Sequence, residues 1–254
     1  MRFGILAHPA GHSLSPAFFG KFFKASGIDA TYEIFDIEPE RLSEFIMKVK
    51  NDGEIKGLSV SSPYKEEIMK FLDEISPEAR MIGAVNTVSC EDGKLRGFNT
   101  DYVGAVAALK EKVADLKGKK VVVLGAGGAS RAIIYGLIKE GAEVCVLNRT
   151  ASKAKRISDH FKNILKREIS CDDLNEIMKY ECDILVQTTS TLIDVPVEFF
   201  KKGMVVMDIV YDPLMTPLLV EAKKAGCEVI TGDRMLLHQA EKQFEIWFGR
   251  RSAN

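Results

Sequence analysis

The 254-residue sequence has no long apolar run and no excess of charge of one sign. Its 35 Lys and Arg residues nearly balance its 36 Asp and Glu residues, and the net charge at pH 7 is -1. This balance excludes nucleic acid or a membrane surface as the main partner. Because 46% of the residues are hydrophobic and no run approaches the length of a membrane span, we expect a soluble globular protein of one or two domains.

Other features are missing as well. Residues 1–7 form a short strand pattern that turns at His8-Pro9, too brief for the apolar core of a signal peptide, so we expect a cytoplasmic protein. The five cysteines include no Cys-x-x-Cys pair, which favours reduced, mostly buried thiols over a disulfide framework. The four histidines show no metal-ligand spacing, so we expect no metal site and assign no role to His12 or His238.

What the sequence does contain is a glycine-rich turn within segment 119–131, which reads as a buried strand running into a helix. Gly125 permits a tight turn, Gly127 lets the backbone approach phosphate oxygens, and Ser130 takes a third position where glycine or alanine is usual. A second predicted strand at 143–148 completes a βαβ unit. The segment therefore predicts a dinucleotide pyrophosphate site, because free amides and the positive helix end face the anion.

The end of that second strand indicates which dinucleotide is bound. An NAD site needs a carboxylate there for the ribose 2′-hydroxyl, whereas an NADP site needs a cation. The chain has Asn148-Arg149-Thr150, followed by Lys153. Arg149 offers a planar donor fork to a 2′-phosphate, and Thr150 offers a hydroxyl. We therefore predict NADP; the alternative is that Thr150 only caps a helix and Arg149 is a solvated surface residue.

Strand and helix patterns alternate along the whole chain. After residue 119 the expected strands lie at 121–124, 143–148, 183–188, 204–209 and 228–231, which is typical of a doubly wound parallel sheet. The first half has expected strands at 3–7, 32–37 and 57–61, helices starting near Pro16 and Pro39, and a hairpin of 84–90 with 94–98. We expect an α/β protein with an N-terminal α/β substrate domain, 1–101 plus 235–254, and a doubly wound NADP-binding domain, 102–234. Periodicity alone does not decide on which half the last helical pattern, 233–248, packs.

Four short segments of the first half are rich in hydroxyl and amide groups: 11–16, 57–65, 83–87 and 97–101. Each lies where an expected strand ends or turns. Ligands of open α/β sheets bind beyond the carboxyl ends of the strands, so these segments are expected to converge on one cleft.

Six motifs occur in a specific order: Ser-Leu-Ser-Pro at 13–16, Pro-x-Lys at 63–65, Gly-Ala-Val-Asn-Thr at 83–87, Gly-x-Asn-Thr-Asp at 97–101, Gly-Ala-Gly-Gly-Ala at 125–129 and Asn-Arg-Thr at 148–150. Together they resemble the shikimate dehydrogenase family, over nearly the whole chain. The resemblance implies a Rossmann-like NADP domain and an oxidoreductase of aromatic amino acid biosynthesis that interconverts 3-dehydroshikimate and shikimate with NADPH. It leaves the oligomeric state open between monomer and homodimer.

The resemblance also implies roles for single residues. Lys65 would be the catalytic acid/base, paired with Asp101, and Ser13 and Ser15 would hold the substrate carboxylate. The full implied substrate set is Ser13, Ser15, Ser61, Lys65, Asn86, Asp101, Tyr211 and Gln239. The implied cofactor set is Gly125, Ala126, Gly127, Gly128, Ala129, Asn148, Arg149, Thr150, Lys153, Ile209 and Gly232.

The residues themselves suit this chemistry, because hydride transfer to a carbonyl needs a proton donor close to the oxygen. Ser62-Pro63 predicts a helix N-cap and first helical residue, which would put Lys65 in the first turn. A cation there opposes the helix dipole, so function taking precedence over helix stability is one explanation for the lysine. Asp101 follows Thr100 at an expected helix start, where a carboxylate is stabilised in its ionised form.

Each of these residues also has an ordinary structural explanation. Taken alone, Lys65 reads as a solvated lysine, Asp101 as helix-start chemistry, Ser15 as a helix cap and Gln239 as an exposed polar residue. Ser13 has no such structural explanation. Two hydroxyls separated by one residue can both face a carboxylate if the loop is extended.

The chain departs from the usual family pattern at five positions. Ser59 and Ser61 stand where Asn and Thr are common, and Gln187, Thr188 and Leu192 stand where Asn, Ala and Gly are common. These changes concern loop anchoring and cofactor affinity more than chemistry. Three alternatives stay open: a related dehydrogenase that accepts quinate or NAD, a catalytically silent NADP-binding module, and a folate or amino-acid dehydrogenase of similar architecture.

Overall fold

The computed structural model describes residues 1–11, 13–189, 191 and 193–252. The chain divides into two compact units. Unit 1 comprises Met1–Thr100 and Gln239–Asn254, and unit 2 comprises Asp101–His238. The divisions lie one and four residues from the expected domain limits at 101 and 234. His12 and Leu192, discussed above, lie outside the described residues.

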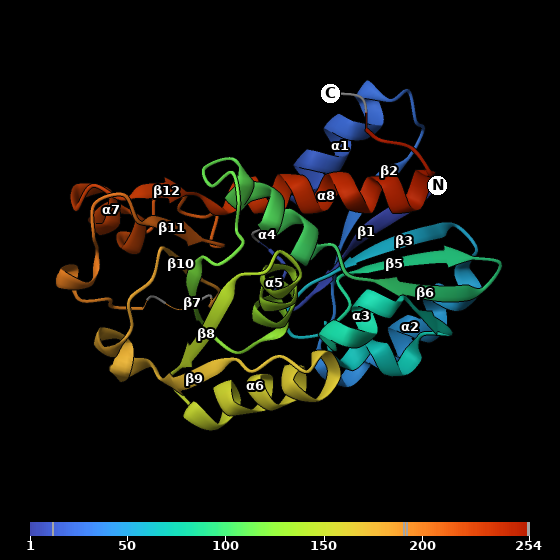
Figure 1. Cartoon of the computed structure of the whole chain (residues 1–254). Coiled ribbons are helices and arrows are strands. Elements are labelled where there is room, and N and C mark those ends of the chain that lie inside the picture. The colour runs from blue at the N-terminus through green and yellow to red at the C-terminus, as the bar shows by residue number, and fades with distance from the viewer. Residues whose placement is uncertain (12, 190, 192, 253–254) are drawn as a thin grey trace. The chain divides into compact units, whose positions relative to one another are not determined.

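Unit 1 contains a mixed six-stranded sheet in the order β2-β1-β3-β5-β6-β4 (Figure 1). Its strands are β1 (Arg2–Ala7), β2 (Thr31–Asp36), β3 (Ile55–Val60), β4 (Glu74–Ile75), β5 (Thr87–Glu91) and β6 (Lys94–Phe98). β1 pairs in parallel with β2 and β3, whereas β5 pairs antiparallel with β3 and β6. The predicted hairpin is therefore confirmed, and it extends the sheet beyond β3.

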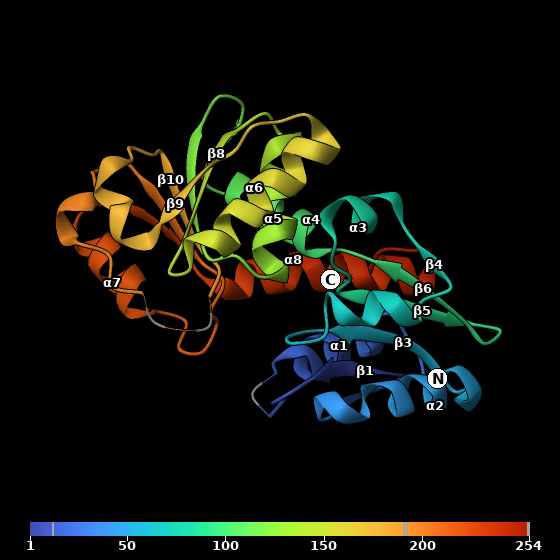
Figure 2. The ribbon, with the colours of Figure 1, turned by 90° about the horizontal axis from the view of Figure 1, so that it is seen from below.

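Helices cover both faces of this sheet, with α1 (Ser15–Ala25) and α2 (Leu42–Asp52) on opposite sides of β1 (Figure 2). The remaining helical elements of unit 1 are α3 (Pro77–Ile82), the 3-10 turns η1 (Pro39–Arg41) and η2 (Glu67–Phe71), and the second half of α8 (Gly232–Phe248). Phe3 of β1 packs with its ring centroid 5.6 Å from Phe23 of α1 and 4.9 Å from Trp247 of α8. Leu6, whose neighbours include Ile46 of α2, belongs to the core on the other face. The terminal helical pattern, left unplaced by its periodicity, thus packs on the aromatic face of unit 1.

Unit 2 contains a parallel six-stranded sheet in the order β12-β11-β10-β7-β8-β9. Its strands are β7 (Lys120–Leu124), β8 (Glu143–Asn148), β9 (Ser170–Asp173), β10 (Ile184–Gln187), β11 (Val205–Asp208) and β12 (Glu228–Ile230). The chain order reverses between β7 and β10, which confirms the predicted doubly wound sheet. In such sheets the carboxyl ends of the two strands at the reversal are where ligands bind.

The helices of unit 2 are α4 (Asp101–Lys110), α5 (Gly128–Lys139), α6 (Ala151–Leu165), α7 (Pro217–Lys224) and the first half of α8, with 3-10 turns η3 (Leu174–Lys179) and η4 (Val197–Phe199). No helix within the described ranges is long and apolar enough to cross a membrane. The described residues also include no group of three or more His, Cys, Asp or Glu side chains able to hold a metal ion.

Candidate functional site

The turn between β7 and α5 requires glycine at its first position. Gly125 has φ of +116°, and a Cβ there would lie 2.4 Å from Thr188 Oγ1 and 2.8 Å from a methyl of Thr189. Its N–H donates to Leu147 O at 2.8 Å, which ties the turn to the end of β8. The backbone therefore turns sharply at the carboxyl end of β7, beside the point where the strand order reverses.

Ser130, at the third fingerprint position, is a structural part of the turn and not merely a small residue. Its Oγ accepts from Gly127 N at 3.1 Å and lies 2.6 Å from Thr188 Oγ1. Thr188 Oγ1 in turn donates to Leu124 O at 2.7 Å, so the Ser130 hydroxyl is the donor to Thr188. These hydrogen bonds join the ends of β7 and β10 to the start of α5. Of the other turn residues, Gly127 is exposed and Ala126, Gly128 and Ala129 are half-buried.

The predicted 2′-phosphate segment lies at the end of β8, on the same edge of the sheet. Asn148 Nδ2 donates to Thr150 O at 3.0 Å, and Thr150 O also accepts from Lys153 N at 2.9 Å. Thr150 occupies the N-cap position of α6, yet its side chain makes no capping hydrogen bond. Arg149, Thr150 and Lys153 are all exposed, so two cationic side chains and one hydroxyl line this helix start.

Ile209 and Gly232, two further predicted cofactor residues, lie in contact. A Cβ on Gly232 would lie 2.4 Å from Ile209 O and 2.5 Å from Val210 O, so only glycine lets α8 start this close to the loop after β11. Asp208, which is 2% exposed, orders that loop by accepting from Val210 N at 3.0 Å and from Thr216 Oγ1 at 2.8 Å. Burial raises the pKa of the Asp208 carboxyl. Tyr211, the next predicted site residue, is half-buried in the same loop.

Gln187, one of the departures from the family pattern, organises the loop after β10. The residue is buried; its Nε2 donates to Thr189 Oγ1 at 2.9 Å and to Thr191 O at 3.1 Å, and its Oε1 accepts from Thr189 N at 3.1 Å. The longer amide therefore holds three groups of a loop that follows directly on the strand reversal.

In unit 1, the serine segment differs from the expectation in two ways. Helix α1 begins at Ser15 itself, with Leu14 in the N-cap position, so Ser15 is not the cap. Ser13 was expected to lack a structural role, yet its Oγ accepts from Ser15 N at 3.2 Å. Because that bond uses only a lone pair of Ser13, its hydroxyl proton stays available to a ligand. Ser15 is buried, whereas Ser13 is half-buried.

Lys65 does not lie in the first turn of an α-helix, so that prediction is wrong. The segment after β3 forms turns and then the short η2, because Lys65 O accepts from Val85 N at 2.7 Å and is not used in an α-helical bond. Ser61 N donates to Leu6 O at 2.9 Å, and Tyr64 is buried with its hydroxyl bonded to Ile37 O. These contacts fix the backbone of half-buried Lys65 beside the residue that precedes Asn86.

Asn86 is the centre of a buried polar cluster in unit 1. Its Oδ1 accepts from Thr100 N at 2.7 Å and from Thr87 Oγ1 at 2.8 Å. Its Nδ2 donates to Thr100 Oγ1 at 2.9 Å and to Gln239 Oε1 at 3.1 Å. The Thr100 amide can only donate, so it fixes the orientation of the Asn86 amide, and this in turn directs the Nε2 of Gln239 away from Asn86.

The cluster places two more predicted residues. Gln239 is 8% exposed and therefore is not the exposed polar residue of the alternative reading. Asp101 is 4% exposed and is the first residue of α4, directly after the Thr100 that Asn86 holds. The predicted helix start at Asp101 is confirmed.

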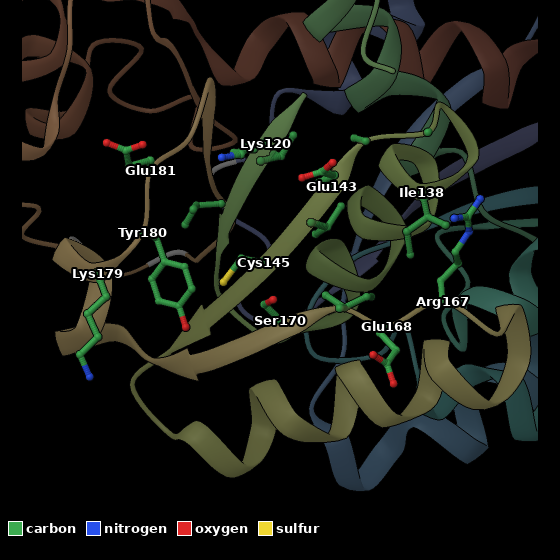
Figure 3. A pocket seen from close by; sticks show the side chains of 16 residues that line it. Lys120, Ile138, Glu143, Cys145, Arg167, Glu168, Ser170, Lys179, Tyr180 and Glu181 are labelled. Carbon is green, nitrogen blue, oxygen red and sulfur yellow. The ribbon is translucent and has the colours of Figure 1, made fainter. Parts of the chain in front are cut away.

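A cavity of about 640 Å³ in unit 2 (Figure 3) is lined by other residues than these. Lys120, Glu143 and Ser170, the first residues of β7, β8 and β9, line it, so it opens at the amino ends of the strands. Burial raises the pKa of Cys145, which lines its wall, to about 12, and such a thiol is unreactive at neutral pH. Ligands of doubly wound sheets bind at the opposite edge.

Comparison with known proteins gives the family. The model of the shikimate dehydrogenase substrate binding domain matches residues 5–88, that of shikimate/quinate 5-dehydrogenase matches 107–207, and that of the shikimate 5′-dehydrogenase C-terminal domain matches 234–253. The chain belongs to the shikimate dehydrogenase family. The resemblance seen in the sequence motifs is thereby confirmed.

Relatives within the shikimate dehydrogenase family match along nearly their full length. The shikimate dehydrogenase (NADP(+)) of Caldanaerobacter subterraneus subsp. tengcongensis is 40% identical, over 97% of this chain and 91% of the relative. A crystal structure of a shikimate dehydrogenase in complex with NADP+ superposes with a TM-score of 0.93 at 38% identity, covering 99% of this chain and 91% of that one. The enzyme of Thermus thermophilus in complex with NADP(H) and shikimate gives 0.89 at 37% identity, covering 99% and 95%.

Three residues that no motif revealed make hydrogen bonds to residues singled out in the sequence. They are Tyr32, bonded to Ser59, Thr188, bonded to Ser130, and Gln243, bonded to Ser59. Gln243 lies four residues after Gln239, one helical turn further along the same face of α8, and that spacing could have indicated it. Thr188 follows β10, the strand next to β7, and stands where the family commonly has alanine, a departure that could have indicated it. Tyr32 lies within a strand, where an aromatic residue is ordinary.

Proposed function

We propose that this protein catalyses the reversible NADPH-dependent reduction of 3-dehydroshikimate to shikimate, a step of aromatic amino acid biosynthesis. The observation that carries the proposal is the 40% identity to a shikimate dehydrogenase (NADP(+)) over 97% of the chain. The end of β8 supports the choice of cofactor, because it offers exposed Arg149 and Lys153 where an NAD site would have a carboxylate.

We assign the cofactor contacts to unit 2 and the substrate contacts to unit 1, apart from Asp101 and Tyr211, which lie in unit 2. The domain limits expected from the sequence are 1–101 plus 235–254 for the substrate and 102–234 for the dinucleotide. The proposed substrate contacts are Ser13, Ser15, Ser61, Lys65, Asn86, Asp101, Tyr211 and Gln239. The proposed cofactor contacts are Gly125, Ala126, Gly127, Gly128, Ala129, Asn148, Arg149, Thr150, Lys153, Ile209 and Gly232. The α5 amides after Gly127 suit a pyrophosphate, and the cations near α6 suit a 2′-phosphate.

In the proposed chemistry, bound NADPH supplies the hydride to the substrate carbonyl. Negative charge develops on the carbonyl oxygen, and the Lys65 ammonium donates a proton there as the alcohol forms. Asp101 accepts hydrogen bonds from a substrate hydroxyl and from Lys65, which orients both. In the reverse direction Lys65 would take the hydroxyl proton.

The setting of the enzyme is part of the proposal. All five cysteines are free, and buried thiols of this kind are typical of a reducing compartment, so we propose that the protein works in the cytoplasm. We propose that it acts on a small molecule as a monomer or homodimer.

The test is the rate of NADPH formation, followed by its absorbance, with shikimate and NADP+. We expect turnover with this pair, and Lys65→Ala should lower kcat by about 10²- to 10⁴-fold, the usual contribution of a positioned acid/base. Lys70→Ala is the matched control, because Lys70 is an exposed lysine paired with Glu67 in the nearby η2. Turnover with quinate or NAD at a similar rate would contradict the specificity, and a silent enzyme with every pair would contradict the function.

A further inference from the structure

Two side-chain hydroxyls of unit 2 connect the glycine turn to the ends of two strands. Ser130 is fully buried, and its Oγ lies 3.1 Å from Gly127 N and 2.6 Å from Thr188 Oγ1. Thr188 Oγ1 lies 2.7 Å from Leu124 O, which also accepts from Thr188 N at 2.9 Å. A Cβ on Gly125 would lie 2.4 Å from Thr188 Oγ1 and 3.3 Å from Ser130 Oγ, so the turn is packed directly against both hydroxyls.

The direction of each hydrogen bond follows from the two backbone groups at its ends. The Leu124 carbonyl can only accept, so the single hydroxyl proton of Thr188 goes to it. Ser130 must therefore donate to Thr188 Oγ1, and its oxygen faces the Gly127 amide, which can only donate. Thr188 thus decides that Ser130 offers a lone pair, and not its proton, to the turn.

This arrangement determines which amides are left for an anion at the start of α5. Gly127 is the N-cap residue, and its own N–H is taken by Ser130. Gly128 and Ala129 hold the first two helical positions, where N–H groups have no intrahelical partner and suit a pyrophosphate. Because the Gly128 N–H belongs to the same planar peptide unit as the Gly127 carbonyl, fixing Gly127 also fixes the direction of this donor.

We propose that Thr188 is a positioning residue for the dinucleotide pyrophosphate, acting through Ser130 on the backbone of Gly127. Without the Thr188 acceptor, the Ser130 hydroxyl can turn to a carbonyl oxygen three or four residues earlier, which takes its lone pair away from the Gly127 amide. Thr188 stands where the family commonly has alanine, so this chain adds a hydroxyl that fixes the turn before NADP+ binds. A turn that is already fixed loses less conformational freedom on binding, so the affinity for NADP+ is higher.

This inference rests on the proposed function for the identity of the dinucleotide, and calorimetric titration with NADP+ alone tests it without turnover. Thr188→Val keeps the branched shape and removes the hydroxyl. The Kd for NADP+ should rise about three- to tenfold, the usual net contribution of one hydrogen bond. Thr188→Ser, which keeps the hydroxyl, should restore a Kd within about twofold of wild type. At saturating NADP+, kcat and the KM for shikimate of Thr188→Val should stay within about twofold, because only cofactor binding is affected.

Two further variants separate positioning from a loss of stability. In Ser130→Ala the bond to the Gly127 amide is already lost, so adding Thr188→Val to this variant should change the Kd little further. Ile184→Val, at the buried amino end of β10, is the control: it removes one methyl group from the core and should leave the Kd for NADP+ unchanged.

The possible results distinguish this inference from the proposed function. An unchanged Kd in Thr188→Val, no recovery in Thr188→Ser, or an equal rise in Ile184→Val would contradict the role of Thr188. If the Kd values change as expected but wild type does not turn over shikimate, the role of Thr188 holds and the proposed function is wrong. If wild type does not bind NADP+, both are wrong.

Discussion

The two candidate sites of this protein are held together over different distances along the sequence. In unit 2, the contacts of the glycine turn and of the segment after β8 range from two or three residues, as with Gly127 to Ser130 and Asn148 to Thr150, to 58 residues for Ser130 with Thr188. In unit 1, Asn86 bonds to Gln239 and Ser59 bonds to Gln243, at separations of 153 and 184 residues. The glycine turn is therefore completed by neighbouring strands of unit 2, whereas the polar cluster around Asn86 is completed by a helix at the far end of the chain.

The largest expected effect comes from removing the centre of the long-range cluster. Asn86→Ala would leave the Thr100 amide without its acceptor and remove the Asn86 donor to Gln239 Oε1 in a buried setting, at a cost of roughly 3 kcal/mol of unfolding free energy. Urea unfolding measures this loss, and the affinity for NADP+ should change little because unit 2 makes its own contacts. Asn163→Ala on the exposed surface of α6 is the control and should stay within about 0.5 kcal/mol. Equal losses of shikimate and NADP+ affinity in Asn86→Ala would contradict the separation of the two sites.

In the glycine turn, an added methyl group should be destabilising at Gly125 and tolerated at Gly127. Gly125→Ala places a Cβ against Thr188 at positive φ and should lower the unfolding free energy by about 2 kcal/mol. A Cβ on Gly127 meets no atom within 4 Å, so Gly127→Ala should fold normally and weaken only NADP+ binding. Thermal unfolding and fluorescence titration with NADP+ measure the two effects. A normal melting temperature for Gly125→Ala would show that the turn adapts.

The same difference in sequence separation explains which parts of the fold could be predicted from the sequence. The strands of the doubly wound sheet were predicted from short apolar runs and glycine punctuation, except β9, whose Ser-Cys-Asp-Asp sequence at 170–173 has no apolar alternation. β4, with two residues, gave no pattern either. The two-domain α/β class and the family were correctly predicted, because motifs such as the glycine turn are encoded within a few residues.

Errors arose where a distant residue decides the local structure. The first turn of a helix was predicted around Lys65 because Ser-Pro resembles a helix start, but the Val85 amide takes the Lys65 carbonyl. Ser15 resembled a cap because it precedes proline, yet it is the first helical residue. The contacts of Tyr32 could not be predicted from the sequence, because its partners Phe19 and Ser59 lie in α1 and β3. The roles of the site residues themselves stay predictions.

The smallest expected effect concerns pH and compares a buried carboxyl of unit 2 with an exposed one of unit 1. Burial raises the pKa of Asp208 above 3.8, so its contribution to stability is complete below that pH and is lost as the pH rises through the folded-state pKa. Asp208→Asn removes this loss, so the stability of the variant relative to wild type should increase as the pH rises from 3.8. The free energy of urea unfolding at several pH values measures it.

Asp36→Asn should show the opposite dependence of stability on pH. The His8 side chain, as the main cause, lowers the pKa of Asp36, so its contribution is present above pH 3.8 and is lost as the pH falls through the folded-state pKa. Relative to wild type, this variant should therefore gain stability as the pH falls. If the stability of both variants relative to wild type changed in the same direction with pH, burial would not be the cause of the raised pKa of Asp208.

Helix α8 belongs to both units, since the division between them falls between His238 and Gln239, in the middle of the helix. During synthesis on the ribosome, all of unit 2 is made before Gln239 and Gln243. Asn86 and Ser59 therefore lack their glutamine partners until synthesis is nearly complete. Truncation after His238 would therefore leave the buried polar groups of Asn86 and Ser59 without Gln239 and Gln243.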